Sequence, residues 1–211
     1  MGLNVLHLNA QNLIDRTVSA RSKFIFIELH FIDNLEIVNS DNDKIEVISE
    51  NNFGGSSNFI LKEEKGTVTI KDVQKFEENN EVRDKDCVVQ PVYPSYLIRI
   101  PRNKKVKIMI TEGNLNVKGY KGDVTIDLER GIARLERLNG RIDLNINVGN
   151  VYCRLKNTEL NIHTNMGFIR GDKNISVGDK EVKTFKGTIG KPNNKLNINA
   201  LKANIYIEKY I

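Results

Sequence analysis

Cysteine and histidine are scarce in this sequence, with two and three residues among 211. Cys87 lies in a charged stretch and Cys153 at an apolar strand position, and two isolated thiols make neither a disulfide framework nor a metal site. Zinc requires several His and Cys ligands at short spacings, which Cys153 and His163 do not supply. The Gly-Gly-x-Gly-x-Asp unit of calcium-binding β-rolls is also missing. We therefore expect no metal and no cofactor.

Long hydrophobic runs are lacking as well. The longest extends from Phe24 to Ile32 and is broken by Glu28 and His30, far short of the roughly 20 residues that a membrane-spanning helix requires. The segment from Met1 to Arg16 does not show the basic start, apolar core and small-residue cleavage site of a secretory signal. We expect no membrane span, and either a cytoplasmic protein or one whose export signal is absent from this sequence.

Catalytic motifs are missing too. The histidines are His7, His30 and His163. No Gly-x-Ser-x-Gly elbow accompanies them to support nucleophilic catalysis, and no Gly-x-x-x-x-Gly-Lys-Ser/Thr loop is present to bind a nucleotide. Glycosidases use paired carboxylates, but Asp127, Glu136 and Asp143 are not expected to share one face of the fold. The sequence does not predict an enzyme.

The charges indicate a solvated surface. The net charge is +5, from 32 Lys and Arg that are interspersed with 27 Asp and Glu. The densest basic run contains Arg99, Arg102, Lys104, Lys105 and Lys107. Because no aromatic residues alternate with these cations, we expect no nucleic-acid binding. Residues 76–86 (FEENNEVRDKD) are acidic and polar and are predicted to form an exposed loop.

The strongest pattern is a glycine at every ninth residue. The series is Gly113, Gly122, Gly131, Gly140 and Gly149, and after Thr158 takes one position it resumes at Gly167. Such a fixed period indicates a repeat architecture. Between the glycines apolar and polar residues alternate, so that Val124, Leu144 and Ile162 are expected to point inward.

Alternation with period two is typical of a strand with one buried face, and glycine can form the tight corner between two strands. Each nine-residue unit is therefore predicted to be one short strand and one turn. The predicted fold class is all-β, a single-stranded β-solenoid, or β-helix, with a less regular β N-terminal part. No helix-period segment of useful length is present, apart from a short helical turn expected from Asn9 to Thr17.

We expect three parts along the chain. These are an N-terminal segment at 1–16, an irregular β part at 17–100 that caps the solenoid, and a regular solenoid at 101–211 with a loop excursion near 174–190. Open sheet ends pair with other chains unless they are covered. The terminal strand from Asn204 to Ile211 is therefore expected to cap the far end or to offer it to a partner.

If two units make one turn of the coil, residues 18 apart stack at about 4.8 Å. That register stacks Lys118, Glu136, Arg154 and Asp172. The alternating charge of this column supports the register but is not interpreted as a site. The same register would place His163 beside Asp127 and Asn145.

Two stretches carry a family resemblance. The run from Tyr96 contains a strand ending in Ile100-Pro101 and then repeated Gly-x-Val/Leu-x-Val/Ile units, and the late motif Lys186-Gly187-Thr188-Ile189-Gly190 is followed by LNINALKANIYIE. From about Thr17 onward the sequence resembles the bacterial putative adhesin domains of unknown function, relatives of the head GIN auto-transporter adhesin domain. The resemblance implies a right-handed β-solenoid, associated with the cell envelope or extracellular, with no catalytic residues.

Three functional hypotheses follow. The first is a non-catalytic adhesin or envelope scaffold that presents a long rigid surface to an unknown protein or glycan partner and can form homo-oligomers through open sheet ends. The second is a carbohydrate-binding or carbohydrate-active module, for which Tyr120 and Tyr152 are the main outward aromatic candidates. The third is a cytoplasmic self-associating scaffold, which the missing export signal favours.

Overall fold

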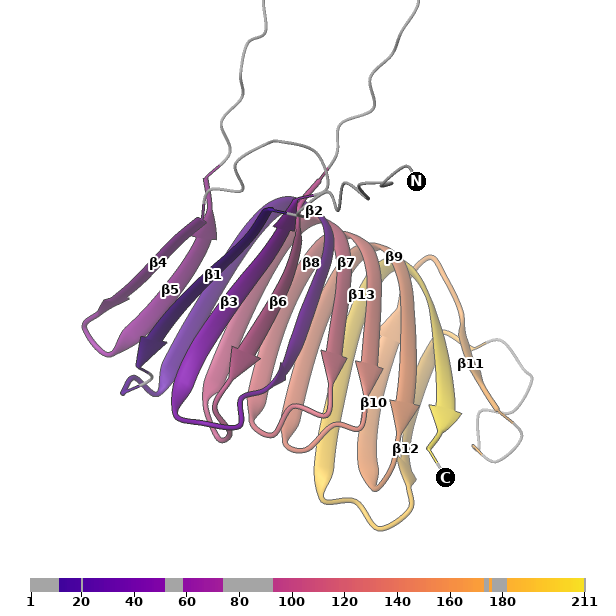
Figure 1. The fold of residues 1–211 in the computed structure, drawn as a ribbon. Helices are drawn as coiled ribbons and strands as arrows, with labels where there is room; N and C mark the ends of the chain where they lie inside the picture. The colour runs from indigo at the N-terminus through magenta and orange to yellow at the C-terminus, as the bar shows by residue number, and fades with distance from the viewer. Residues whose placement is uncertain are drawn as a thin grey trace, which may run out of the picture.

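The computed structural model describes residues 12–19, 21–51, 59–73, 93–172, 175 and 182–210, and the regular secondary structure of these residues is entirely β. Thirteen strands form one mixed sheet (Figure 1). They are β1 (Asn12–Ser19), β2 (Phe24–Asn39), β3 (Lys44–Asn51), β4 (Phe59–Glu64), β5 (Thr67–Asp72), β6 (Ser95–Ile100), β7 (Lys105–Lys118), β8 (Asp123–Glu136), β9 (Arg141–Leu155), β10 (Thr158–Thr164), β11 (Ile169–Gly171), β12 (Thr184–Ile189) and β13 (Asn194–Lys209). The predicted all-β class is confirmed.

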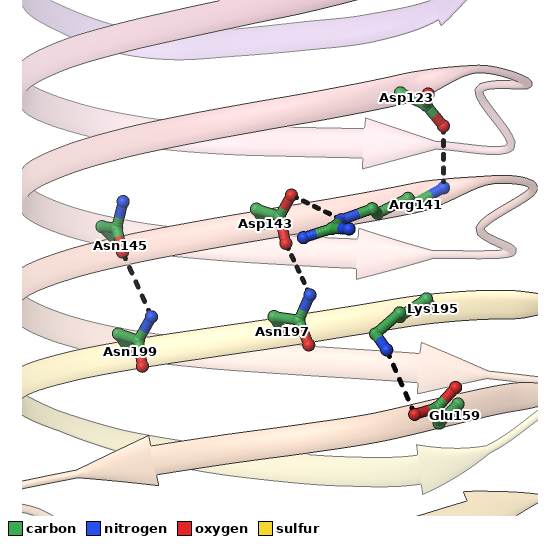
Figure 2. Close-up of polar contacts among 8 residues, drawn as sticks. All are labelled: Asp123, Arg141, Asp143, Asn145, Glu159, Lys195, Asn197 and Asn199. Atoms are coloured by element: carbon green, nitrogen blue, oxygen red, sulfur yellow. Dashed lines mark hydrogen bonds and ion pairs between the residues drawn. The ribbon is translucent and has the colours of Figure 1, made fainter.

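Strands β7, β8 and β9 are parallel and follow one another with a constant register. Lys105 of β7 pairs with Asp123 of β8, 18 residues later, and Val124 of β8 pairs with Ile142 of β9 at the same offset. Each strand bends near its middle. We call the residues before the bend the first arm and those after it the second arm; the first arms lie in one layer and the second arms in the other (Figures 1 and 2). Residues 18 apart therefore stack, as the glycine spacing predicts.

The periodic glycines occupy two kinds of position. Gly113, Gly131 and Gly149 lie at the bends inside β7, β8 and β9, and Gly167 lies at the corresponding bend between β10 and β11. Gly122 and Gly140 lie in the turns ahead of β8 and β9. A Cβ on Gly131 would lie only 1.8 Å from the carbonyl oxygen of Gly113, so the backbones of adjacent strands meet there. Three of the six glycines are thus bends within strands, Gly167 is the equivalent bend between β10 and β11, and only Gly122 and Gly140 lie at the predicted corners.

The core lies between the two layers. Along each arm buried apolar residues alternate with more exposed ones, which is the pattern of a strand with one face turned to the core. Val124, Leu144 and Ile162 are all buried, as predicted. Because the 18-residue register brings like positions over one another, the buried side chains form one continuous cluster along the stack.

The N-terminal strands extend the stack and then reverse direction. One edge of β2 pairs in parallel with β7, and its other edge pairs with β5 along the first arm and β6 along the second. Beyond these, β4 is antiparallel to β5, β3 to β6 and β1 to β3. The helical turn expected from Asn9 to Thr17 is wrong for residues 12–17, because their backbone pairs with β3. Cys87 and residues 76–86 lie outside the described residues.

The C-terminal strand is inserted inside the stack. β13 pairs in parallel with β9 on one edge and with β10 and β11 on the other. The expectation that Asn204 to Ile211 covers or exposes an end is therefore wrong for 204–209. Leu196 and Ile198 align with Ile142 and Leu144 of β9, so the inserted strand keeps the apolar positions of its first arm in phase with those of β9.

The region near 174–190 is only partly an excursion. Thr184–Ile189 forms β12, which pairs antiparallel with β10, while 173–174 and 176–181 lie outside the described residues. The division of the chain at residues 16 and 100 stays a prediction, and the sheet continues from β2 to β7 across the second of these boundaries.

The bend glycines generate a stability prediction. Gly131→Ala should lower the free energy of unfolding by about 2–4 kcal/mol, because its methyl group meets the Gly113 carbonyl. Gly119→Ala is the control: Gly119 also has a positive φ, of +64°, but nothing lies within 4 Å of an added Cβ, so only about 1–2 kcal/mol should be lost. Urea denaturation measures both. Equal losses would contradict a steric role for the bend.

Candidate functional site

A ladder of polar side chains covers the first-arm face across β8, β9, β13 and β10 (Figure 2). Asn145 Nδ2 donates to Asp127 Oδ1 at 2.8 Å, and Asn199 Nδ2 donates to Asn145 Oδ1 at 3.5 Å. In the next column Asn197 Nδ2 donates to Asp143 Oδ1 at 2.5 Å. Each of these amides donates a hydrogen bond to a side-chain oxygen on the neighbouring strand, so the ladder joins β13 to β9.

Charged groups in the same face are also paired. Arg141 Nε donates to Asp143 Oδ2 at 2.8 Å, and Lys195 Nζ lies 3.2 Å from Glu159 Oε1. Burial opposes ionisation of Asp143, but the hydrogen bonds from Arg141 and Asn197 outweigh it and hold the pKa of that carboxyl below its ordinary value. A carboxyl with a lowered pKa is a poor general acid.

The three candidate carboxylates do not converge, as predicted. Asp127 and Asp143 lie on first arms, whereas Glu136 ends the second arm of β8. His163 does not reach the expected partners Asp127 and Asn145, because Asn199 of the inserted β13 lies between Asn145 and His163. Its ring nitrogens instead contact Thr184 Oγ1 at 3.0 Å and Asn165 Oδ1 at 2.7 Å.

Insertion of β13 also changes the charge column on the second-arm face. Lys118, Glu136 and Arg154 stack in the predicted order. Glu208 of β13 then pairs in register with Arg154, in the place expected for Asp172. The predicted column is correct over three strands and wrong at the fourth.

The second-arm face carries a stack of aromatic and arginine side chains. The Tyr152 and Tyr206 rings are parallel, with centroids 5.0 Å apart and an angle of 8° between their planes. The Arg134 guanidinium lies 5.6 Å from the Tyr152 centroid on the β8 side, and Phe168 meets Tyr206 edge-on at 5.6 Å. Further along, the Arg154 guanidinium lies 5.1 Å from the Tyr210 centroid. We call Arg134, Tyr152, Arg154, Tyr206 and Tyr210 the tyrosine face.

The geometry of this face limits what it can bind. A sugar ring stacks on an open aromatic face, but the neighbours on adjacent strands cover both faces of Tyr152 and of Tyr206. What remains for a partner is the ring edges and hydroxyls, together with the arginine heads. Tyr152 is 40% exposed, and a shallow hollow lies beside it, between Arg134, Arg154 and Glu208.

Sequence reasoning identified Tyr152 but missed Tyr206. The two residues are 54 apart, which is six nine-residue units, so their common phase was readable from the repeat. Their adjacency was not, because the phase does not tell which strand a C-terminal segment joins. A second missed contact is the pair His30 Nδ1 and Asp72 Oδ1, at 2.7 Å.

Tyr120 is not a surface residue. The turn between Gly119 and Gly122 folds its ring into the core, where it is 1% exposed, so the prediction that it binds a surface partner is wrong. Its hydroxyl lies 3.2 Å from the Lys104 carbonyl oxygen and 3.4 Å from that of Pro101. Burial, aided by the charge of Asp123, raises the pKa of Tyr120 well above its ordinary value.

The described part of the chain contains neither a reactive thiol nor a cluster of metal ligands. Burial raises the pKa of the Cys153 thiol to about 12, which leaves it protonated and unreactive at neutral pH. No three His, Cys, Asp or Glu side chains of the described residues are placed to hold a metal ion. None of these residues forms a helix long and apolar enough to cross a membrane.

The buried Tyr120 predicts a pH dependence of stability. Unfolding returns its pKa to about 10, so above that pH the unfolded chain releases a proton that the folded chain retains. Stability is therefore fully present below pH ~10 and falls as the pH rises. Tyr120→Phe should reduce the alkaline slope by close to one proton in urea denaturation between neutral and alkaline pH. Identical slopes would show that the Tyr120 hydroxyl titrates freely in the fold.

No family model matches the chain, and no curated protein matches it in sequence. Among solved structures it is similar to a putative cell adhesion protein from Clostridium sporogenes, at 14% identity over 95% of this chain and 100% of that chain, with a TM-score of 0.65. Two others have TM-scores of 0.34 at 12% identity: a putative adhesin from Bacteroides fragilis, over 94% of this chain and 98% of that chain, and a putative lipid binding protein from Parabacteroides distasonis, over 96% and 98%. The Clostridium likeness shows a shared fold.

Proposed function

We propose that the chain is a right-handed β-solenoid built of nine-residue units, acting without catalysis as an adhesin or envelope scaffold. The constant 18-residue register from β7 to β9 supports the solenoid. The structural likeness to the Clostridium sporogenes protein, which is described as a putative cell adhesion protein, supports the function. The paired carboxylates of the first-arm face favour binding over hydrolysis.

The observation that carries the proposal is the tyrosine face. Tyrosine and arginine are enriched in protein interfaces because each combines a large contact area with a polar end. Here they project from three adjacent strands of one rigid sheet, so that little side-chain freedom is lost on binding. We assign this face, with Tyr152 at its centre, as the contact surface for a protein partner.

Carbohydrate stacking is less well supported by the same face, because both tyrosine rings are covered on each side. Self-association through the sheet ends stays a second candidate. The specific observation that favours it is β12, whose pairing among the described residues is with β10 on one edge. Light scattering of the purified chain distinguishes an end-to-end assembly from a monomeric adhesin.

The proposal is tested with immobilised mucin, collagen and fibronectin and with a printed glycan array, using biolayer interferometry. The wild-type chain should bind at least one protein surface. Tyr152→Ser combined with Arg154→Ser should weaken that binding by roughly 10–30-fold, as expected for interface hot spots.

The matched control is Lys107→Ser combined with His163→Ser, which removes a cation and an aromatic ring from the first-arm face. It should change the affinity by less than about twofold. Absence of binding to every surface in the panel would count against an adhesin, and equal losses in the two double variants would count against the tyrosine face.

A further inference from the structure

Five turns lie side by side along one edge of the stack. Four of them join a second arm to the following first arm, and 190–193 joins β12 to the first arm of β13. Figure 1 shows these turns along the lower edge of the sheet. Backbone hydrogen bonds order them: Asn103 N donates to Lys121 O at 2.7 Å, Gly122 N to Asn139 O at 2.9 Å, and Asn193 N to Asn157 O at 2.9 Å. Lys195 N, at the start of β13, donates to Gly140 O at 3.1 Å. The order is therefore 101–104, 119–122, 137–140, 190–193 and 156–157.

These turns carry cations and no acidic residue. Their charged residues are Arg102, Lys104, Lys121, Arg137, Lys156 and Lys191. All but Lys104 are exposed, and Lys104 Nζ donates to the Ser22 carbonyl oxygen. We call Arg102, Lys121, Arg137, Lys156 and Lys191 the basic turn edge. Charges that are interspersed along the sequence are thus separated by the fold.

The acidic residues within two positions of these turns are Asp123, Glu136 and Glu159, and all three belong to strands. Asp123 Oδ1 accepts a hydrogen bond from Arg141 N at 3.2 Å, and Glu159 is paired with Lys195. On the N-terminal side the second-arm end of the basic turn edge meets the turn 40–43, which carries Asp41 and Asp43, because Ser40 N donates to Ile100 O at 2.8 Å. On the first-arm side Lys105 N donates to Lys23 O at 3.0 Å, so the exposed cations Arg21 and Lys23 adjoin the first of the five turns.

The spacing makes the cations act together. Adjacent turns are separated by about 4.8 Å, as the strands are, so the five turns together span roughly 20 Å. That separation is shorter than the screening length of about 8 Å at physiological salt, and the potentials of neighbouring cations therefore add. The backbones of the turns are held by the hydrogen bonds between them and by the buried ring of Tyr120, so the points from which the cations project are fixed.

Amide side chains accompany the cations. Asn103, Asn139 and Asn193 are exposed in three of the turns. A hollow at the C-terminal end of the edge is lined by Arg137, Lys156, Asn139 and Asn193 together with Tyr210. Amides beside cations can bind hydroxyl and carboxylate groups on one polymer.

We propose that the basic turn edge binds a linear anionic polysaccharide, whose acidic groups pair with the cations and whose hydroxyls meet the asparagines. This inference rests on the proposed function and names a ligand class that the proposed function leaves open. An anionic lipid surface is disfavoured because the five turns expose no large apolar side chain that could enter a bilayer. Single-stranded nucleic acid is disfavoured because Tyr210 alone offers an aromatic ring, and its ring lies against Arg137 and Arg154.

The test measures binding of polygalacturonate to the full chain by isothermal titration calorimetry at low and physiological salt. Wild-type binding should weaken as salt rises. Lys121→Gln, Arg137→Asn, Lys156→Gln and Lys191→Gln together should reduce the affinity at least about tenfold. Asparagine replaces Arg137 because that residue has a φ of 50°, which asparagine tolerates. The two-residue variant Lys121→Gln/Lys191→Gln should lose affinity in the same direction, and it serves if the fourfold variant does not fold.

The charge-matched control removes four exposed strand cations through Lys62→Gln, Lys107→Gln, Arg130→Gln and Lys202→Gln, and should stay within about twofold of wild type. Equal weakening in both fourfold variants would reduce the effect to net charge and overturn the proposal. So would equally tight binding of dextran, of oligothymidylate or of phosphatidylglycerol vesicles. Loss of polygalacturonate binding in the Tyr152→Ser/Arg154→Ser variant would also overturn it. If the chain binds none of the protein surfaces but still binds polygalacturonate, only the proposed protein contact is contradicted.

Discussion

Close approach of parallel backbones at the bend glycines is the constraint on which the rest of the structure depends. At Gly131 and Gly149 the position of a Cβ is already taken by the carbonyl oxygen of the glycine one turn earlier, at 1.8 Å in both cases. A Cβ at either position would displace the neighbouring backbone, so glycine keeps the bend and its hydrogen bonds there, whereas β13 carries Ala203 in register with Gly149. The bend places two arms face to face, and the facing arms create the buried cluster.

The repeat phase made much of this fold predictable. Period two within each unit placed Val124, Leu144 and Ile162 in the core, and two units per turn gave the 18-residue offset. What the phase could not give is the slot that a strand occupies. β13 fits between β9 and β10 because its apolar positions are in phase with both, and a strand added at the end would satisfy the same pattern.

The errors in the candidate site have the same origin. His163 and the fourth member of the charge column were misplaced because β13 was inserted ahead of them, and Tyr206 was missed because it belongs to that inserted strand. Tyr120 failed for a different reason. Apolar–polar alternation predicts which side chains of a strand point inward, but it does not apply to a turn. In this turn the backbone conformation at Gly119 and Gly122 determines which way the ring of Tyr120 points.

The Tyr152–Tyr206 stack and the hollow beside Arg137 form only once β13 is in place. Tyr152 belongs to β9 and Tyr206 to β13, and the two rings stack only after the last strand has entered beside a strand that lies 54 residues earlier. The hollow that contains Arg137 and Tyr210 likewise needs β8, β9 and β13 in place. Contacts of such high sequence separation form late in folding. The Tyr152–Tyr206 stack and this hollow therefore belong to the completed sheet, and a chain that lacked β13 would retain the repeat while losing both.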